Sequence, residues 1–299
     1  MTYFTAKSGV RHYTKLYKVT YDRARVDNVY QSLRLGILPT FDEVVHARDV
    51  ARRLLGLGKT PDFLTGDGQH KMALSNAMGG NIKSWVMHLA PAKNSGYNTC
   101  PEASDGCAKS CLYKSGHGIL SSNQAARIKR TRLYFEHRSV FAVVLFDRLE
   151  RLSKSKDYQS AIRLNGTSDI LWEKREPWIF EVFAGLIFYD YTKVHQRFAW
   201  KIPSNYHLTF SRSESNHDLA MHLLSLGHNV AIVFEPDLFK RATLSGEYSG
   251  YRAIDATLHD RRFEDPRGVV CALKPLGPAK QDDSGFVLRS SLQMVGGIV

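Results

Sequence analysis

Cysteine is scarce in this sequence, and long hydrophobic runs are missing. Only four of the 299 residues are cysteine, and three of these are crowded together as Cys100, Cys107 and Cys111. That spacing does not suggest a disulfide framework, and clustered thiols in a reducing cytoplasm more often serve metal or redox chemistry. The longest apolar stretches, such as residues 230–234, are far shorter than the roughly 18 residues of a membrane helix. The first residues lack the apolar core of a signal peptide, so we expect a cytoplasmic protein with no membrane partner.

Several motifs of nucleotide binding and catalysis are also absent. The sequence has no Gly-x-x-x-x-Gly-Lys-Ser/Thr, Gly-x-Ser-x-Gly or His-Glu-x-x-His, which argues against a P-loop ATPase, a common serine hydrolase and a zincin. Tyr13, Tyr17 and Tyr21 are spaced like the paired nucleophiles of rolling-circle replication initiators, but the His-hydrophobe-His metal motif of those enzymes is missing. We therefore expect these tyrosines to pack or, with Lys15 and Lys18, to offer an aromatic and basic surface to single strands.

The composition is that of a folded, basic protein. Apolar residues make up 43% of the chain, aromatic residues 11% and charged residues 23%, which excludes disorder as its main state. There are 41 lysines and arginines against 29 aspartates and glutamates, so the net charge is +12. This charge favours DNA or RNA as a partner, although many solvated surfaces are also basic.

The chain divides at a turn-rich stretch, residues 60–68. Residues 1–70 form a basic, tyrosine-rich extension with one clear helix over 41–57, capped by Thr40 and closed by Gly56 or Gly58. Residues 71–299 alternate between short strand-like runs and helical patterns. We predict strands at 83–89, 160–164, 186–191, 206–210, 229–234, 251–255 and 268–273, and helices at 123–153, 178–186 and 216–226. This alternation predicts an α/β fold: a parallel (βα)n domain, barrel-like or partly so, with the extension packed on it.

Polar residues follow five successive predicted strands. In parallel α/β folds, ligands bind at the carboxyl ends of the strands. Lys193 and Arg212 favour an anionic small molecule, because neither residue type caps a helix N-terminus. Serine, threonine, asparagine and aspartate at these positions have a second explanation, since they cap the helix that follows. The residues predicted to bind cofactor or substrate are Asn165, Ser168, Asp169, Lys193, Ser211 and Arg212.

Cys100, Cys107 and Cys111 form the most informative pattern. They follow the first strong strand directly, and thiolates so close in sequence can converge on one metal centre. Three protein ligands rather than four leave one coordination position open, as in working sites. Three alternatives remain: an iron–sulfur cluster, a zinc site and free thiols. The residues that could complete a zinc site are His88, His117 and Cys271, although Cys271 is more typical of a buried strand residue.

The stretch from Cys107 to Lys114, Cys-Ala-Lys-Ser-Cys-Leu-Tyr-Lys, resembles the Cys-x-x-x-Cys-x-aromatic-Cys motif of the radical-SAM superfamily. Lys114 stands where that motif has its third cysteine, so Cys100 would substitute from upstream. The loop more closely resembles uncharacterised phage-encoded three-cysteine proteins, in which a similar loop precedes a strand end like the one from Arg163 to Asp169.

This resemblance covers about residues 75–280. It implies a partial barrel, a [4Fe–4S] cluster held by Cys100, Cys107 and Cys111, and S-adenosylmethionine as a second cofactor. For a phage-encoded chain it also implies the cytoplasm of the host.

A basic segment, residues 126–134, follows the cysteines. On a helix, Arg127 and Arg130 would share one face, which is either solvated or in contact with a nucleic-acid backbone. The candidate nucleic-acid-binding residues are Arg127, Lys129, Arg130 and Arg132.

Two classes of function are therefore expected. The first is a radical-SAM-like iron–sulfur enzyme whose substrate is derived from nucleic acid. The second is a phage protein of nucleic-acid binding or replication, in which the cysteines form a structural zinc or thiol site.

Overall fold

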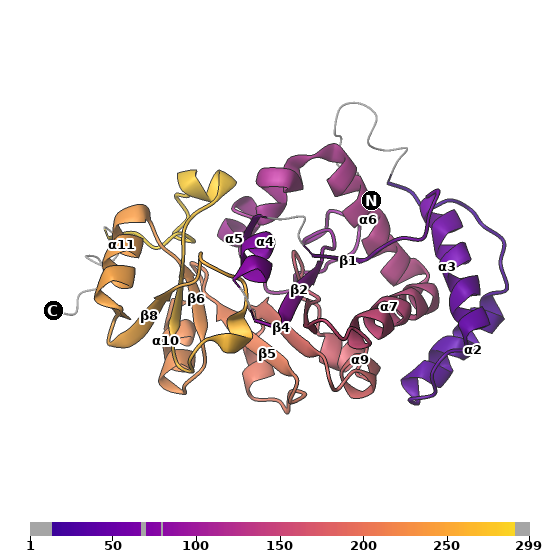
Figure 1. Cartoon of the computed structure of the whole chain (residues 1–299). Coiled ribbons are helices and arrows are strands. Elements are labelled where there is room, and N and C mark those ends of the chain that lie inside the picture. The colour runs from indigo at the N-terminus through magenta and orange to yellow at the C-terminus, as the bar shows by residue number, and fades with distance from the viewer. Residues whose placement is uncertain (1–13, 67–69, 79, 291–299) are drawn as a thin grey trace.

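A mostly parallel β-sheet runs through the middle of the molecule (Figure 1). The protein is described from a computed structural model, in which residues 14–66, 70–78 and 80–290 are defined. Over these ranges nine strands join in the order β1-β2-β3-β4-β5-β6-β9-β8-β7. Their bounds are β1 (Leu64–Thr65), β2 (Ile82–Met87), β3 (Gln159–Arg163), β4 (Ile187–Thr192), β5 (Tyr206–Ser211), β6 (Val230–Val233), β7 (Glu247–Tyr248), β8 (Tyr251–Asp255) and β9 (Val270–Leu273).

The inner strands, from β2 across to β8, are all parallel, and β1 and β7 pair antiparallel at the two edges. Every strand predicted from the sequence is present, and the predicted α/β fold with a parallel sheet is confirmed. Strands β2 to β6 are neighbours in chain order, as expected for consecutive right-handed βα units. The described strands do not close on themselves, so the barrel-like curvature stays a prediction.

Helices connect most of the strands. Their bounds are α2 (Arg23–Arg34), α3 (Phe41–Leu55), α4 (His70–Ala77), α5 (Asp105–Lys109), α6 (Ser121–Glu136), α7 (Arg138–Ser153), α8 (Trp172–Arg175), α9 (Trp178–Val182), α10 (His217–Ser225) and α11 (Pro236–Ser245). Short 3-10 helices are η1 (Leu112–Lys114), η2 (Gly116–Ile119), η3 (His195–Phe198), η4 (Arg262–Glu264) and η5 (Gly277–Gln281). Among the described helices, none is both long and apolar enough to cross a bilayer.

Local signals place α3 where the sequence predicts it. The Thr40 hydroxyl accepts a hydrogen bond from the N–H of Glu43, and the Glu43 carboxylate accepts one from the N–H of Thr40. Gly56 closes the helix with a φ of +65°, a left-handed conformation that favours glycine. The single helix predicted over 123–153 is instead two helices, α6 and α7, because the backbone of His137 leaves the helical region at φ −139°.

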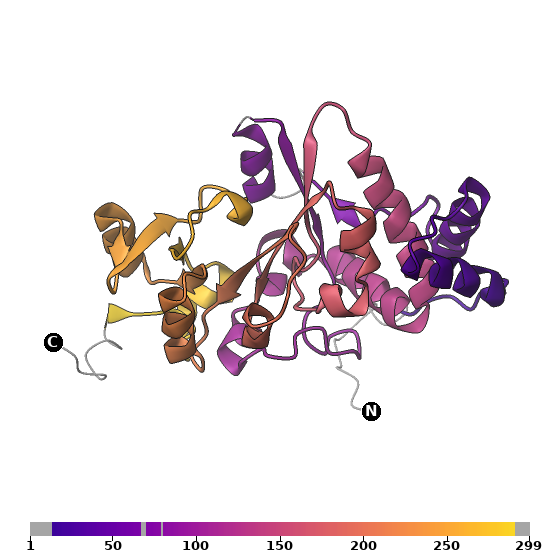
Figure 2. The same cartoon turned by 90° about the horizontal axis from the view of Figure 1, so that it is seen from below.

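The N-terminal helices α2 and α3 lie at the opposite end of the molecule from α11 and β8 (Figures 1 and 2). Their buried side chains, such as Leu33 and Leu54, share one core with Phe141 of α7. Tyr17 and Tyr21 precede α2 in a non-helical segment, and Tyr13 lies outside the described residues. The ammonium of Lys129 lies 5.2 Å from the centre of the Tyr17 ring, and the Tyr21 hydroxyl is 2.9 Å from Nδ1 of His137.

The two faces of the sheet are covered differently. Large side chains of the strands, such as Ile162, Phe188 and Phe210, are fully buried in the cores beneath the helices. β9 inserts between β6 and β8, so the connection from β8 to β9 runs back across the sheet. A right-handed crossover in that direction must pass over the opposite face. This connection reaches β3 and β4, where Asp260 pairs with Arg163.

Candidate functional site at the carboxyl ends of the strands

The cysteine loop lies over the carboxyl ends of β2 and β3. The Thr99 hydroxyl donates a hydrogen bond to the Ala90 carbonyl at 2.7 Å, and the N–H of Asp169 donates to the Thr99 carbonyl at 2.7 Å. The Thr167 hydroxyl donates to the carbonyl of Leu89. These bonds join the loop to the segment that follows β3. The cysteine loop and the strand end from Arg163 to Asp169, which occur together in the resemblance to phage-encoded proteins, are therefore neighbours in space.

The three thiols of the loop are half-buried, and none of them is in a disulfide. Burial raises the pKa of Cys100 to about 11, and a charge on Cys111 raises it further. Burial also raises the pKa of Cys111, and a charge on Cys107 acts in the same direction. Cys111 is therefore within electrostatic reach of each of the other two cysteines.

The spacing of these thiols bears on the kind of metal centre they could form. Within the described ranges, no three side chains of His, Cys, Asp or Glu are placed to hold a single metal ion. Thiolates on one zinc ion lie about 4 Å apart, because each Zn–S bond is about 2.3 Å long. An iron–sulfur cluster spreads its cysteine ligands over several metal atoms and tolerates a wider spacing. Cys271 is fully buried on β9, as expected, with its thiol 3.5 Å from a carboxylate oxygen of Asp265.

Arg127 is a buried cation beside these thiols. Its side chain is in the interior of the protein with only 8% of the residue exposed, and its guanidinium lies 5.6 Å from the centre of the Tyr113 ring. In the part of the chain that is described, Nη1 of Arg127 has no hydrogen-bond partner and the guanidinium has no carboxylate partner. Burial lowers the pKa of Arg127, and negative charge on Tyr113 or Cys111 opposes this effect. An anionic group at the thiols would therefore be stabilised by Arg127.

Unlike Arg127, the other basic residues of α6 have polar partners inside the molecule. Arg130 donates to the His88 carbonyl at 2.7 Å, and burial lowers the pKa of Arg130 to about 10. Lys129 donates to the carbonyl of Leu55 at 2.8 Å, and Arg132 pairs with Glu136 at 2.8 Å. None of the four predicted residues is a freely solvated side chain. Their binding to nucleic acid stays a prediction.

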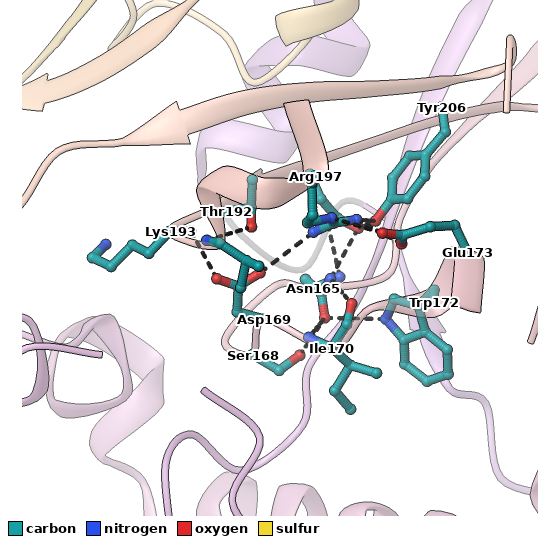
Figure 3. A network of polar contacts seen from close by, with 12 residues as sticks. Asn165, Ser168, Asp169, Ile170, Trp172, Glu173, Thr192, Lys193, Arg197 and Tyr206 are labelled. Carbon is teal, nitrogen blue, oxygen red and sulfur yellow. Dashed lines mark hydrogen bonds and ion pairs between the residues drawn. The ribbon is translucent and has the colours of Figure 1, made fainter. Parts of the chain in front are cut away.

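Asn165 organises the turn after β3 (Figure 3). Its side-chain oxygen accepts hydrogen bonds from the Ser168 hydroxyl at 2.8 Å, the Ile170 N–H at 3.0 Å and the Trp172 indole N–H at 3.0 Å. Its N–H and side-chain amide donate to the carboxylate of Asp190. Burial raises the pKa of Asp190 to about 7, and the hydrogen bond from Tyr206 limits the rise.

Asp169 belongs to the same buried network. It accepts a hydrogen bond from the Lys193 N–H at 2.8 Å and pairs with Arg197 at 3.4 Å. Arg197 is fully buried and bidentate, with both of its bonds to Glu173 at 2.9 Å. Asn165, Ser168 and Asp169 thus support one another at the strand ends, and a direct role in ligand binding stays a prediction for them.

The side chains of Lys193, Ser211 and Arg212 differ in how far they are exposed to solvent. The Lys193 side chain extends away from the network in Figure 3, and its ammonium donates to the Ser211 hydroxyl at 2.7 Å. Arg212 is only 5% exposed and donates to the carbonyls of Gly285 and Phe286, so it holds the C-terminal segment against the sheet. Of the predicted binding residues, Lys193 and Ser211 are the two that are half-buried and whose side chains take no part in this network.

Glu214, which the sequence analysis missed, fastens the cysteine loop from the far side. Its two carboxylate oxygens accept hydrogen bonds from the Gly106 N–H at 2.7 Å and the Ser104 hydroxyl at 2.9 Å. Ser104 in turn caps α5 by accepting from the N–H of Cys107. No local pattern marks this contact, because it joins residues more than a hundred positions apart.

Comparison with protein families gives one match, to the family described as gene product 88, over residues 63–290. The match starts just before β1 and includes the cysteine loop, the strand ends and Glu214. The chain belongs to the gene product 88 family. This is a phage-type family, so the assignment to phage-encoded proteins is confirmed at that level. No curated protein and no solved structure matches the chain.

In this gene product 88 protein, the sheet also presents polar side chains that the sequence analysis did not identify. Arg163 and Tyr191 lie on the face opposite the helices, where the guanidinium is 4.6 Å from the centre of the tyrosine ring. A period-two pattern of polar residues, Tyr189, Tyr191 and Lys193, was the signal for this face. Two hollows of about 250 Å³ lie elsewhere, one at the connection from α7 to β3 and one beside α11.

Proposed function

We propose that this member of the gene product 88 family is a radical-SAM-like iron–sulfur enzyme with an anionic, nucleic-acid-derived substrate. Cys100, Cys107 and Cys111 would hold a [4Fe–4S] cluster over the carboxyl ends of the strands. Supporting this, the loop that carries them is bonded to the segments that follow β2 and β3 on one side and to Glu214 on the other. Ligands of parallel α/β proteins bind at this edge of the sheet.

The observation that carries the proposal is the buried guanidinium of Arg127. Burying a cation without a carboxylate partner is costly, so natural proteins seldom keep one without a reason. Tyr113 and Cys111 are two groups within electrostatic reach of Arg127 that can become negative. Three thiolates that hold a cluster would supply the negative charge that could pair with Arg127.

All three proposed ligands are cysteine thiols, which are the usual ligands of iron–sulfur clusters. A charge on Cys111 raises the pKa of Cys100, and a charge on Cys107 raises the pKa of Cys111, so Cys111 lies within electrostatic reach of both. A cluster with three protein ligands keeps one iron free for a co-reactant, and the resemblance to radical-SAM proteins suggests S-adenosylmethionine. Because burial favours the neutral thiols, cluster assembly has to release protons, and metal binding should weaken at low pH.

The test is anaerobic purification of the full chain, followed by an absorption spectrum and analysis for iron, sulfide and zinc. We expect iron and sulfide in the wild type and in Cys271→Ala, which removes a thiol outside the loop. Cys100→Ala, Cys107→Ala and Cys111→Ala should each lose most of the iron. Iron-free wild-type protein, or equal loss from Cys271→Ala, would contradict the cluster, and zinc alone would select the structural zinc site.

Binding of the proposed co-reactant is tested separately. S-adenosylmethionine should raise the thermal midpoint of the iron-loaded chain but not that of Cys111→Ala, since a ligand of the folded state stabilises it. Equal shifts in the two proteins would show that the cluster does not hold the co-reactant.

A second candidate function is nucleic-acid binding with the cysteines as a structural site. The net charge of +12 favours it, and Lys93, Lys109 and Lys114 are exposed around the cysteine loop. Retention of the chain on DNA or RNA should then fall steeply with salt. Retention that is indifferent to salt would remove this candidate.

A further inference from the structure

Over β3 to β5, the sheet face opposite the helices carries several polar side chains, which is unusual for a parallel sheet, whereas over β6 and β9 it holds a small apolar cluster against which Tyr191 packs. Parallel strands are normally covered on both sides and carry apolar residues on both faces. Here Ile162, Phe188 and Phe210 fill the cores under the helices. Because neighbouring residues of a strand point to opposite faces, Arg163 and Ser211 lie on the other side. Polar residues in this position need a partner from outside the sheet.

Arg163 and Tyr191 each carry a donor on this face that has no hydrogen-bond partner among the described residues. In the described part of the chain, Nε of Arg163 and the hydroxyl of Tyr191 are buried and make no hydrogen bond. The guanidinium lies 4.6 Å from the centre of the Tyr191 ring, so the two side chains belong to one cluster. Nη1 of Arg163 is held at 3.0 Å by Asp260, which fixes the orientation of the guanidinium and leaves Nε free.

Lys193 and Ser211 extend the cluster toward the cysteine loop. Lys193 directly follows β4, two residues after Tyr191, and its bond to Ser211 places its side chain on the same face as Tyr191. Its ammonium donates to the Ser211 hydroxyl, and within the described residues it pairs with no carboxylate. Through its N–H, Lys193 is bonded to Asp169, and the charge of Asp169 adds to the burial that raises the pKa of Cys100. The cluster and the thiols are therefore close.

We propose that Arg163, Tyr191, Lys193 and Ser211 bind the phosphate group of the substrate. Two cations and one carboxylate leave a net positive charge, and all four side chains present hydrogen-bond donors. The donors come from three neighbouring strands, which suits a tetrahedral oxyanion with several oxygens better than a planar carboxylate. This inference rests on the proposed function only in treating the phosphate compound as a substrate.

Titration calorimetry of the full, metal-free chain with inorganic phosphate tests the site. Lys193→Met should weaken phosphate binding about tenfold, the effect of losing one charge-assisted hydrogen bond. Tyr191→Phe should weaken it about fivefold, since only the hydroxyl is removed. Arg163 is left intact, because its loss would break the buried ion pair with Asp260. Lys156→Met, at an exposed lysine between α7 and β3, is the matched control and should bind phosphate like the wild type.

Three results would overturn the site: no phosphate binding by the wild type, equal loss in Lys156→Met, or acetate binding as tight as phosphate. The iron content of the anaerobically purified wild type separates the two proposals. Phosphate binding without any iron in the wild type leaves the phosphate site standing and removes the cluster. Iron without phosphate binding removes the phosphate site alone.

Discussion

Gly166 packs against β2 without room for a side chain. Its N–H donates to the Met87 carbonyl at 2.9 Å. An added Cβ would lie 2.6 Å from that oxygen, 2.6 Å from Nδ1 of His88 and 2.6 Å from Cγ1 of Val86. Backbone is among these atoms, so the clash cannot be relieved by turning one side chain.

Gly166→Ala should therefore lower the free energy of unfolding by about 1–3 kcal/mol, the usual cost of overpacking. Denaturant unfolding followed by circular dichroism measures it. Gly185→Ala is the control, because nothing lies within 4 Å of a Cβ at that position. A wild-type stability for Gly166→Ala would mean that β2 and the turn after β3 are less tightly joined than described.

At the same scale, the sequence identifies the polar strand ends but not their partners. Asn165 and Asp169 are where a ligand-binding edge should have them, yet their hydrogen bonds go to Trp172, Arg197 and the backbone. A side chain that holds a turn and one that holds a ligand have the same residue type and the same position. For Asp169, the long-range contact with Arg197 distinguishes the two roles, and the sequence does not reveal that contact.

Among the elements, α5 of the cysteine loop is held by one distant carboxylate, in addition to the bonds of Thr99. Glu214 accepts from the Ser104 hydroxyl and from the N–H of Gly106 in the first turn of α5. Glu214→Ala should leave the sheet folded but free the loop, since both bonds are lost together. Hydrogen exchange should become faster in residues 104–111 and stay unchanged in β4 and β5, and iron content should fall.

Glu102→Ala is the control for this change, because Glu102 is an exposed residue of the same loop. It should affect neither exchange nor iron. Faster exchange throughout the sheet in Glu214→Ala would assign Glu214 to global stability instead.

Elements with local signals were predictable, and those made by distant contacts were not. α3 has a capping box and a closing glycine, and the inner strands have β-branched and aromatic runs. The break at His137 between α6 and α7 has neither glycine nor proline, so no local signal marks it. β1 and β7 are two residues long and exist only through their pairing with β2 and β8.

At the scale of the whole molecule, the two larger hydrophobic cores lie between one continuous sheet and the helices that cover it. The first contains side chains of α2, α3 and α7 with β2 to β4, and the second contains side chains of α10 and α11 with β6, β8 and β9. β5 contributes to both, through Tyr206 to the first and Phe210 to the second. Since a strand shared by two cores cannot unfold with one and stay with the other, we expect a single cooperative transition.

The four tryptophans make this testable. Trp172 and Trp178 are in the first core, Trp85 packs against it, and the ring of Trp200 lies beside Lys174 of α8. Tryptophan fluorescence therefore reports on the first core, whereas circular dichroism reports on the whole chain.

Leu54→Ala in the first core and Leu224→Ala in the second should each lower the free energy of unfolding by about 2–5 kcal/mol. Both leucines are buried, at 1% and 2% exposure. Each variant should show fluorescence and circular dichroism transitions that coincide, because unfolding of either core carries the other with it. Leu226→Ala, at a position 60% exposed beside α10, should change stability by less than about 0.5 kcal/mol. Leu224→Ala could instead shift the circular dichroism transition and leave the fluorescence transition in place. The two cores would then unfold separately, and the first core, with its N-terminal helices, would be an independent unit.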